Sequence, residues 1–136
     1  MTEPMDYYQV TEGYRFPEAG YRLAPALVAA YLDAVDDDAN FRDGEQVPPL
    51  AVAALAMNSL SNSLTMPDGS IHTQQEVSCL APASVGESII CRSWISRKKE
   101  RGRFQMMTVE TAVTREDGQP LLRGKTSFIL PEQAAT

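Results

Sequence analysis

The chain has 136 residues, which is enough for one domain with a substantial core and hardly enough for two. Hydrophobic residues make up 43% of the sequence and charged residues 22%, as in ordinary globular proteins. The net charge of −6 disfavours nucleic-acid binding, because recognition of a phosphate backbone needs a basic surface. We therefore expect a single domain over residues 1–136 with no nucleic-acid partner.

Membrane insertion, secretion and metal binding are not expected from this sequence. No apolar run approaches the roughly 20 residues that span a bilayer, and the acidic start lacks the features of a signal peptide. These features predict a cytoplasmic protein. The two cysteines, Cys79 and Cys91, fit no metal spacing and fall in predicted strands, where we expect small buried side chains rather than a disulfide. The chain has a single histidine, so no metal site is predicted.

The first half of the chain predicts a short covering segment and two helices. Residues 1–20 mix aromatic residues with glycine and proline and predict one or two short strands that cover an edge of the sheet. Pro25 opens a helix with an apolar face at helical spacing, which fails near Asp36-Asp37-Asp38. Pro48-Pro49 starts a second helix over residues 49–60. This helix is apolar on nearly every side, which predicts that it is buried.

The second half predicts an antiparallel sheet of four strands over residues 71–80, 88–97, 103–115 and 121–130. Asp117-Gly118 predicts one hairpin turn, and residues 99–102 predict another. Nothing else in so short a chain can bury the second helix, so the sheet must wrap it. The predicted class is α+β, and the predicted architecture is a hotdog fold, in which a curved antiparallel sheet encloses a central apolar helix. One open edge and one open face predict a dimer.

The sequence resembles the MaoC-like hotdog hydratases and dehydratases, especially the N-terminal dehydratase halves related to the dehydratase region of type I fatty-acid synthases. The resemblance runs from about residue 13 to residue 131. The matching pieces are Tyr31-Leu32-Asp33-Ala34-Val35 with the acidic turn, Val47-Pro48-Pro49, Ile71-His72-Thr73-Gln74-Gln75-Glu76 and Val85-Gly86-Glu87. It implies an acyl thioester of coenzyme A or acyl carrier protein as the substrate, with no other cofactor. It also implies addition of water to a 2-enoyl thioester, or the reverse, within a homodimer or a heterodimer of hotdog proteins.

The catalytic turn of that family, Gly-Asp-x-Asn-Pro-x-His, is only partly present. The corresponding segment runs from Asp37 to Asp43, where Asp38 and Asn40 match the family and Asp43 replaces the histidine. The resemblance assigns Asp38 to hold or activate a water molecule and Asn40 to orient it. Pro49 and Leu50, at the start of the second helix, are expected to bind the substrate, and backbone amides near Leu50 would polarise the thioester carbonyl.

Four further residues are candidate substrate contacts. His72 is included because its family position lies near the ligand face, although a hydrogen bond to a neighbouring strand is the simpler role. Arg97, Lys98 and Arg101 belong to a basic cluster that suits the phosphates of coenzyme A. The competing interpretation of this cluster is a solvated hairpin.

Three interpretations remain open at this point. In the first, the chain is the half of a composite dehydratase that shapes the acyl tunnel, while a second hotdog protein supplies the histidine. In the second, Asp38 and Asp43 form a carboxylate pair in which one member acts as the acid. In the third, the fold serves thioester hydrolysis or non-catalytic binding of an acyl thioester. All three place the acyl chain alongside the second helix.

Overall fold

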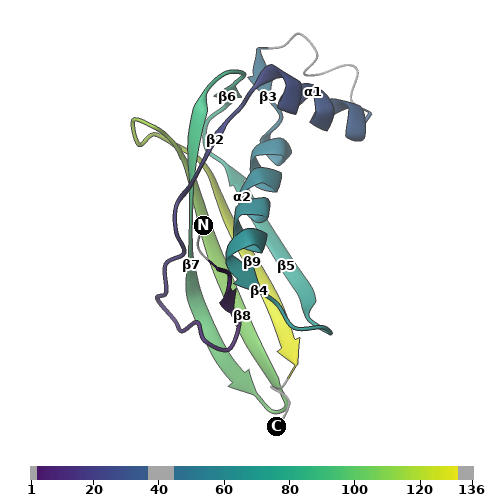
Figure 1. Ribbon diagram of the computed structural model, residues 1–136, viewed down its shortest axis with the longest axis vertical. Coiled ribbons are helices and arrows are strands. Elements are labelled where there is room, and N and C mark those ends of the chain that lie inside the picture. Colours follow the sequence, from purple (N-terminus) through teal and green to yellow (C-terminus); the bar gives the residue numbers. More distant parts are fainter. Residues whose placement is uncertain (1–2, 37–44, 132–136) are drawn as a thin grey trace.

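A five-stranded antiparallel sheet carries helix α2 along one face (Figure 1). This computed structural model describes residues 3–36 and 45–131. The strand order is β2-β7-β8-β9-β5. The strands are β2 (Ala19–Arg22), β5 (Ile71–Cys79), β7 (Ser88–Arg101), β8 (Phe104–Arg115) and β9 (Pro120–Pro131). The predicted α+β class and the curved antiparallel sheet around an apolar helix are confirmed.

The two described helices are α1 (Pro25–Ala34) and α2 (Pro49–Ser63). Each begins with proline, whose fixed φ suits the first turn and whose missing N–H would have no helical partner there. The chain leaves α1 at Asp36, which has a φ of 55°, so this helix ends where the acidic run predicts. Within the described residues, neither helix is long and apolar enough to cross a bilayer.

Helix α2 packs on the sheet through a face of mostly small residues. The buried positions of this helix are Ala51, Val52, Ala56, Ser59 and Leu60. On the opposite side Leu50 is 61% exposed. The prediction that α2 is buried on nearly every side is therefore wrong for the isolated chain, because the sheet covers only one side of the helix.

The core has two apolar clusters on the face of the sheet that carries α2. The first joins both helices to β7, β8 and β9 around Leu32, Val52 and Ile89. The second surrounds Ile95 and Met107 and contains residues of the N-terminal segment. Between the clusters, the buried hydroxyls of Ser93 and Thr111 form a hydrogen bond of 3.1 Å across β7 and β8.

Residues 3–18, here called the N-terminal strap, cross the same face of the sheet. Within the strap, β1 (Met5–Asp6) pairs in parallel with β4 (Leu64–Thr65), the two residues that follow α2. The strap buries Tyr7, Val10 and Phe16 in the second cluster. The predicted short strands are thus present as β1 and β2, but only β2 covers an edge of the main sheet, and β1 pairs with β4 instead.

Two details of the strands differ from the sequence prediction. β7 continues through Arg101, and the turn follows at Gly102 with a φ of 61°, so the hairpin predicted over residues 99–102 begins too early. Cys91 is buried, and desolvation raises the pKa of its thiol to about 11. Cys79, in contrast, is exposed, because β5 is an edge strand of the isolated chain. Both thiols are free.

Candidate functional site

The approach to helix α2 is held by a short two-stranded ladder. β3 (Gln46–Val47) pairs antiparallel with β6 (Ala83–Ser84), and the Val85 N–H donates to the Glu45 carbonyl oxygen at 3.1 Å. Val47 is buried. The two residues that follow it, Pro48 and Pro49, open the helix. This ladder therefore sets where the first turn of α2 lies.

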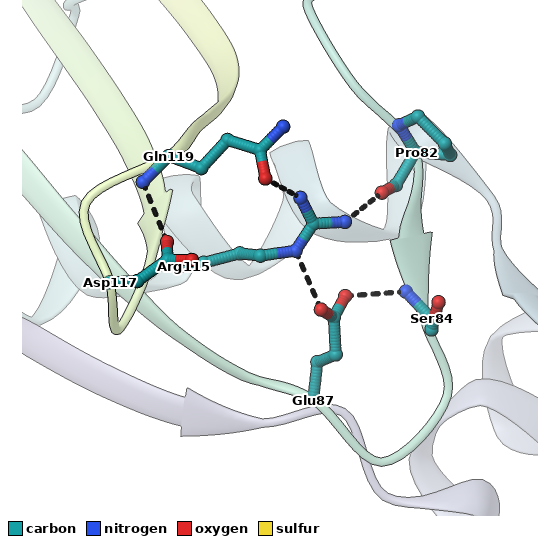
Figure 2. A network of polar contacts seen from close by, with 6 residues as sticks. All are labelled: Pro82, Ser84, Glu87, Arg115, Asp117 and Gln119. Carbon is teal, nitrogen blue, oxygen red and sulfur yellow. Dashed lines mark hydrogen bonds and ion pairs between the residues drawn. The ribbon is translucent and has the colours of Figure 1, made fainter.

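Arg115 ties this ladder to the end of the main sheet, as Figure 2 shows. Its guanidinium donates from Nε to Glu87 Oε1 at 2.6 Å, from Nη2 to the Pro82 carbonyl oxygen at 2.7 Å, and from Nη1 to Gln119 Oε1. Glu87 Oε2 in turn accepts the Ser84 N–H at 2.7 Å. One arginine thus links the β8–β9 turn to β6, and through β6 to β3 and the start of α2.

The first turn of α2 has one unpartnered backbone donor in the part of the chain that the structure describes. Pro48 and Pro49 have no N–H, and the Ala51 N–H donates to the Pro48 carbonyl oxygen at 3.0 Å. No side chain caps the helix. This leaves the N–H of Leu50, where the partial positive charge of a helix N-terminus favours a developing negative charge.

Three pockets lie in a row along the seam between α2 and the edge strand β5, beginning beside Pro49. Their volumes are about 20, 10 and 270 Å³, so the first two have room for about one water molecule each and the third is much larger. The first adjoins Pro49 and Cys79, and the second lies between Met57 and Gln75. The third, here called the end cavity, is mostly apolar and is lined by Met57, Leu60, Ser61, Leu64, Met66 and Phe128. We call the whole seam the α2–β5 groove.

One polar pair interrupts the apolar course of the groove. Thr126 Oγ1 donates to Gln75 Oε1 at 2.7 Å and lies 3.6 Å from the Met57 sulfur. Neither Thr126 nor Gln75 is among the site residues predicted from the sequence. The alternation that places Gln75 on the same side as Val77 was the available signal, but a bulge between His72 and Gln74 interrupts that pattern.

A larger cavity, of about 590 Å³, lies on the other flank of α2. The strap, β2 and the second half of the helix enclose it, and Tyr14, Tyr21, Ser59 and Asn62 are among its lining residues. Its charged lining residues are Glu3 and Glu18. Its described lining residues include no lysine, arginine or histidine, so they offer no cation to a phosphate group.

The structure brings only some of the predicted site residues together. Asp38, Asn40 and Asp43 lie outside the described residues, and their predicted roles stay predictions. Pro49 lines the pocket at the open end of the α2–β5 groove, and Leu50 follows it in the first turn of α2 with an exposed side chain.

His72 lies at the other end of the groove. It pairs with Phe128, which lines the end cavity, whereas Cys79 lies beside Pro49. At about 3.3 Å per residue, roughly 20 Å of β5 separates His72 from the helix start. Its Nε2 is 3.1 Å from the Gln74 carbonyl oxygen, and its ring is 5.2 Å from that of Phe128. The geometry therefore does not place His72 beside Pro49 and Leu50.

The basic cluster is divided between the two faces of the sheet because neighbouring strand residues alternate, and a bulge between Ile95 and Arg97 sets which of them face α2. Beyond it, Arg97 and Arg101 stand opposite Thr108 and Phe104, on the face away from α2, and both arginines are exposed. Lys98 stands opposite the buried Met107, on the α2 face. The three predicted phosphate contacts therefore do not form one patch.

Lys98 is engaged with the strap. Its ammonium donates to the carbonyl oxygens of Tyr7 at 2.6 Å and Val10 at 2.8 Å, and its backbone N–H donates to Glu12 Oε1 at 2.9 Å. Desolvation lowers the pKa of this amine. Among residues 3–36 and 45–131, no three histidine, cysteine or acidic side chains are grouped as a metal site would require.

Comparison of the sequence with known families gives a match over most of the chain. Residues 20–123 match the FAS1-like dehydratase domain region. The chain belongs to this family. Comparison with curated protein sequences gives no match.

Solved structures with the same fold include a hydratase and two dehydratases. The unliganded R-hydratase PhaJ1 from Pseudomonas aeruginosa superposes with a TM-score of 0.75 at 16% identity, covering 93% of this chain and 86% of its own. The MaoC-like dehydratase from Rhodospirillum rubrum gives 0.75 at 17% identity, with coverages of 95% and 98%. A chain of the HadBC (3R-hydroxyacyl-ACP dehydratase) complex from Mycobacterium tuberculosis gives 0.69 at 16% identity, with coverages of 87% and 96%. These similarities establish the hotdog fold of this chain.

The Glu87–Arg115 contact predicts a pH dependence of stability. The Ser84 N–H, and with it the Arg115 guanidinium, hold the pKa of Glu87 below its ordinary value. A carboxyl whose pKa is lower in the folded state stabilises the protein above its unfolded-state pKa, and this contribution is lost as the pH falls through the folded-state value. Urea unfolding should therefore show that Glu87→Gln costs about 1 kcal/mol at neutral pH and progressively less on acidification. Parallel pH profiles for the two proteins would contradict this assignment.

Proposed function

We propose that the chain is a subunit of a MaoC-like hydratase or dehydratase that binds an acyl thioester of coenzyme A or acyl carrier protein in the α2–β5 groove. One observation carries the proposal. The Leu50 N–H, which has no partner among the described residues, directly follows Pro49, and Pro49 lines the first pocket of a groove whose far end is an apolar cavity. A thioester has a carbonyl oxygen for such a donor and an acyl chain for such a cavity.

The chemistry of hydration explains why this arrangement suits the reaction. Water adds through its oxygen to C3 of the enoyl chain, the electron pair moves to the thioester oxygen as an enolate, and C2 then takes a proton. Dehydration is the reverse. A fixed N–H beside the thioester oxygen stabilises the enolate more than the ground state, and this difference accelerates the reaction. In this proposal Leu50 supplies that donor, and Asp38 and Asn40 position the water.

The proton transfers require a further group, which we assign to a second hotdog protein. The family histidine is replaced by Asp43, and the only histidine of the sequence, His72, pairs with Phe128, which lines the far end of the groove. The similarity to a chain of HadBC, itself a complex, supports assembly from two hotdog proteins. The open edge strand β5, whose side chains are largely exposed, is the proposed contact.

Loss of the Leu50 N–H is the direct test of the proposed function. Leu50→Pro removes the N–H from an exposed first-turn position, whereas Leu50→Ala shortens the side chain and keeps it. With crotonyl-CoA and longer enoyl-CoAs, followed by loss of the conjugated thioester absorbance, Leu50→Pro should reduce kcat by about 100-fold. Leu50→Ala should remain close to the unaltered protein, with circular dichroism verifying the fold of both. Equal activity of the two variants would contradict the role of Leu50.

The same assay separates the three chemical interpretations. Hydration by the chain alone that disappears in Asp38→Asn would show that it catalyses without a different partner. Hydration only after addition of a histidine-bearing MaoC protein would identify a half-enzyme. Release of free thiol would identify a thioesterase and contradict the proposed hydro-lyase activity.

Dimerisation through β5 should appear in amide hydrogen exchange. An isolated edge strand leaves alternate N–H groups without a ladder partner, and pairing with a second subunit protects them. We expect exchange in residues 71–79 to slow as protein, or the partner hotdog protein, is added. The other edge strand, β2, is the internal control and should be unaffected. Exchange in β5 that is independent of both concentrations would contradict this interface.

A further inference from the structure

The N-terminal strap is fastened to the half of the sheet that lies behind the end cavity. The Tyr7 N–H donates to the Thr65 carbonyl oxygen at 3.1 Å, immediately after α2. Further along, the Gly13 N–H donates to the Ile95 carbonyl oxygen at 2.7 Å, and the Phe16 N–H donates to that of Ser93 at 2.9 Å. The strap thus spans from the end of α2 to the middle of β7.

Between these two attachments, Lys98 holds the strap by hydrogen bonds. Its ammonium binds two strap carbonyls, those of Tyr7 and Val10, and its backbone N–H binds the Glu12 carboxylate. Charge-assisted hydrogen bonds of this kind are stronger than neutral ones. The bulge that turns Lys98 onto the α2 face is therefore what allows β7 to hold the strap.

The strap side chains occupy the space behind the wall of the end cavity. Tyr7 is 5% exposed, Val10 is fully buried and Phe16 is 6% exposed. They belong to the same apolar cluster as Leu60 and Leu64, which line the end cavity. Met57, Met66 and Phe128, which also line it, pack against that cluster. Methionine side chains adapt readily to an added apolar group. The wall of the end cavity can therefore move to admit such a group until it meets the strap.

We propose that the N-terminal strap, fastened by Lys98, closes the far end of the acyl groove and sets the longest acyl chain that the protein accepts. This inference rests on the proposed function, because it concerns the same groove. A chain that fits the end cavity meets Leu60 and Leu64, with the strap directly behind them. A longer chain must displace Tyr7 and Val10, and the Lys98 hydrogen bonds oppose that displacement.

Binding of a saturated series from butyryl-CoA to palmitoyl-CoA, measured by titration calorimetry below micelle-forming concentrations, tests this role. Saturated thioesters cannot be hydrated, so the measurement reports binding alone. Affinity for the unaltered protein should rise with chain length and then fall at a cut-off. Lys98→Met, which removes the fastening, and Val10→Ala, which removes bulk behind the wall, should each move the cut-off by about two carbons. Each should also bind the first chains beyond the original cut-off about tenfold more tightly, because every further buried methylene favours binding.

Lys99→Met is the matched control, because it removes the same charge from the neighbouring exposed position. Its cut-off should equal that of the unaltered protein. Val10→Ala keeps every backbone hydrogen bond of the strap, so it tests the inference even where Lys98→Met loosens the fold. An unchanged cut-off in both Lys98→Met and Val10→Ala would overturn the role of the strap alone. If the unaltered protein binds no member of the series, the proposed function fails together with this inference.

Discussion

The packing of helix α2 against the sheet is the interaction on which the rest of the structure depends. Ala51, Ala56 and Ser59 let the helix backbone approach the strands closely, while Val52 and Leu60 fill the two apolar clusters. This close approach fixes the axis of the helix, and therefore the position of the Leu50 N–H. It also leaves the opposite side of α2 uncovered. The same contact that builds the core thus creates an open groove, and the helix N-terminus stands at its start.

The two flanks of α2 are completed differently. On the flank next to β2, the N-terminal strap covers the core. The strap is held by backbone hydrogen bonds to β7 and by Lys98, whose ammonium donates to two strap carbonyl oxygens. On the side of β5 the isolated chain supplies no such cover, and the edge strand is exposed along nearly its whole length. A sheet edge of this length needs a partner or some protection against unwanted pairing. One flank is thus covered by the strap and the other ends in an exposed edge strand, as we expect of a subunit in a larger hotdog assembly.

Much of the fold was predictable because its patterns are regular. Helical spacing after Pro25, the prolines before α2, the alternation in β8 and the Asp117-Gly118 turn each indicate one local structure, and all four agree with the same architecture.

The failures arise where a residue's environment depends on distant pairing. Cys79 looked like a core residue, but β5 lies at an edge. Arg97 and Lys98 lie on opposite faces because neighbouring strand residues alternate, but a single-residue bulge decides that Lys98 is the one on the α2 face, and this bulge leaves no mark in the sequence pattern. The N-terminal strap has no periodic pattern, so its path across the α2 face of the sheet could not be predicted from the sequence. Of the candidate site, the sequence predicted Pro49 and Leu50 at the helix start, but not which N–H is free.

The central claim is that a thioester carbonyl lies against the start of α2. Carbon NMR of butyryl-CoA labelled with ¹³C at the thioester carbonyl tests it most directly, because this saturated thioester cannot be turned over by hydration. Binding should move the carbonyl resonance downfield of its position in water, and Leu50→Pro should abolish that displacement. A bound thioester whose carbonyl resonance stays at its aqueous position, or moves equally in Leu50→Pro, would contradict the account.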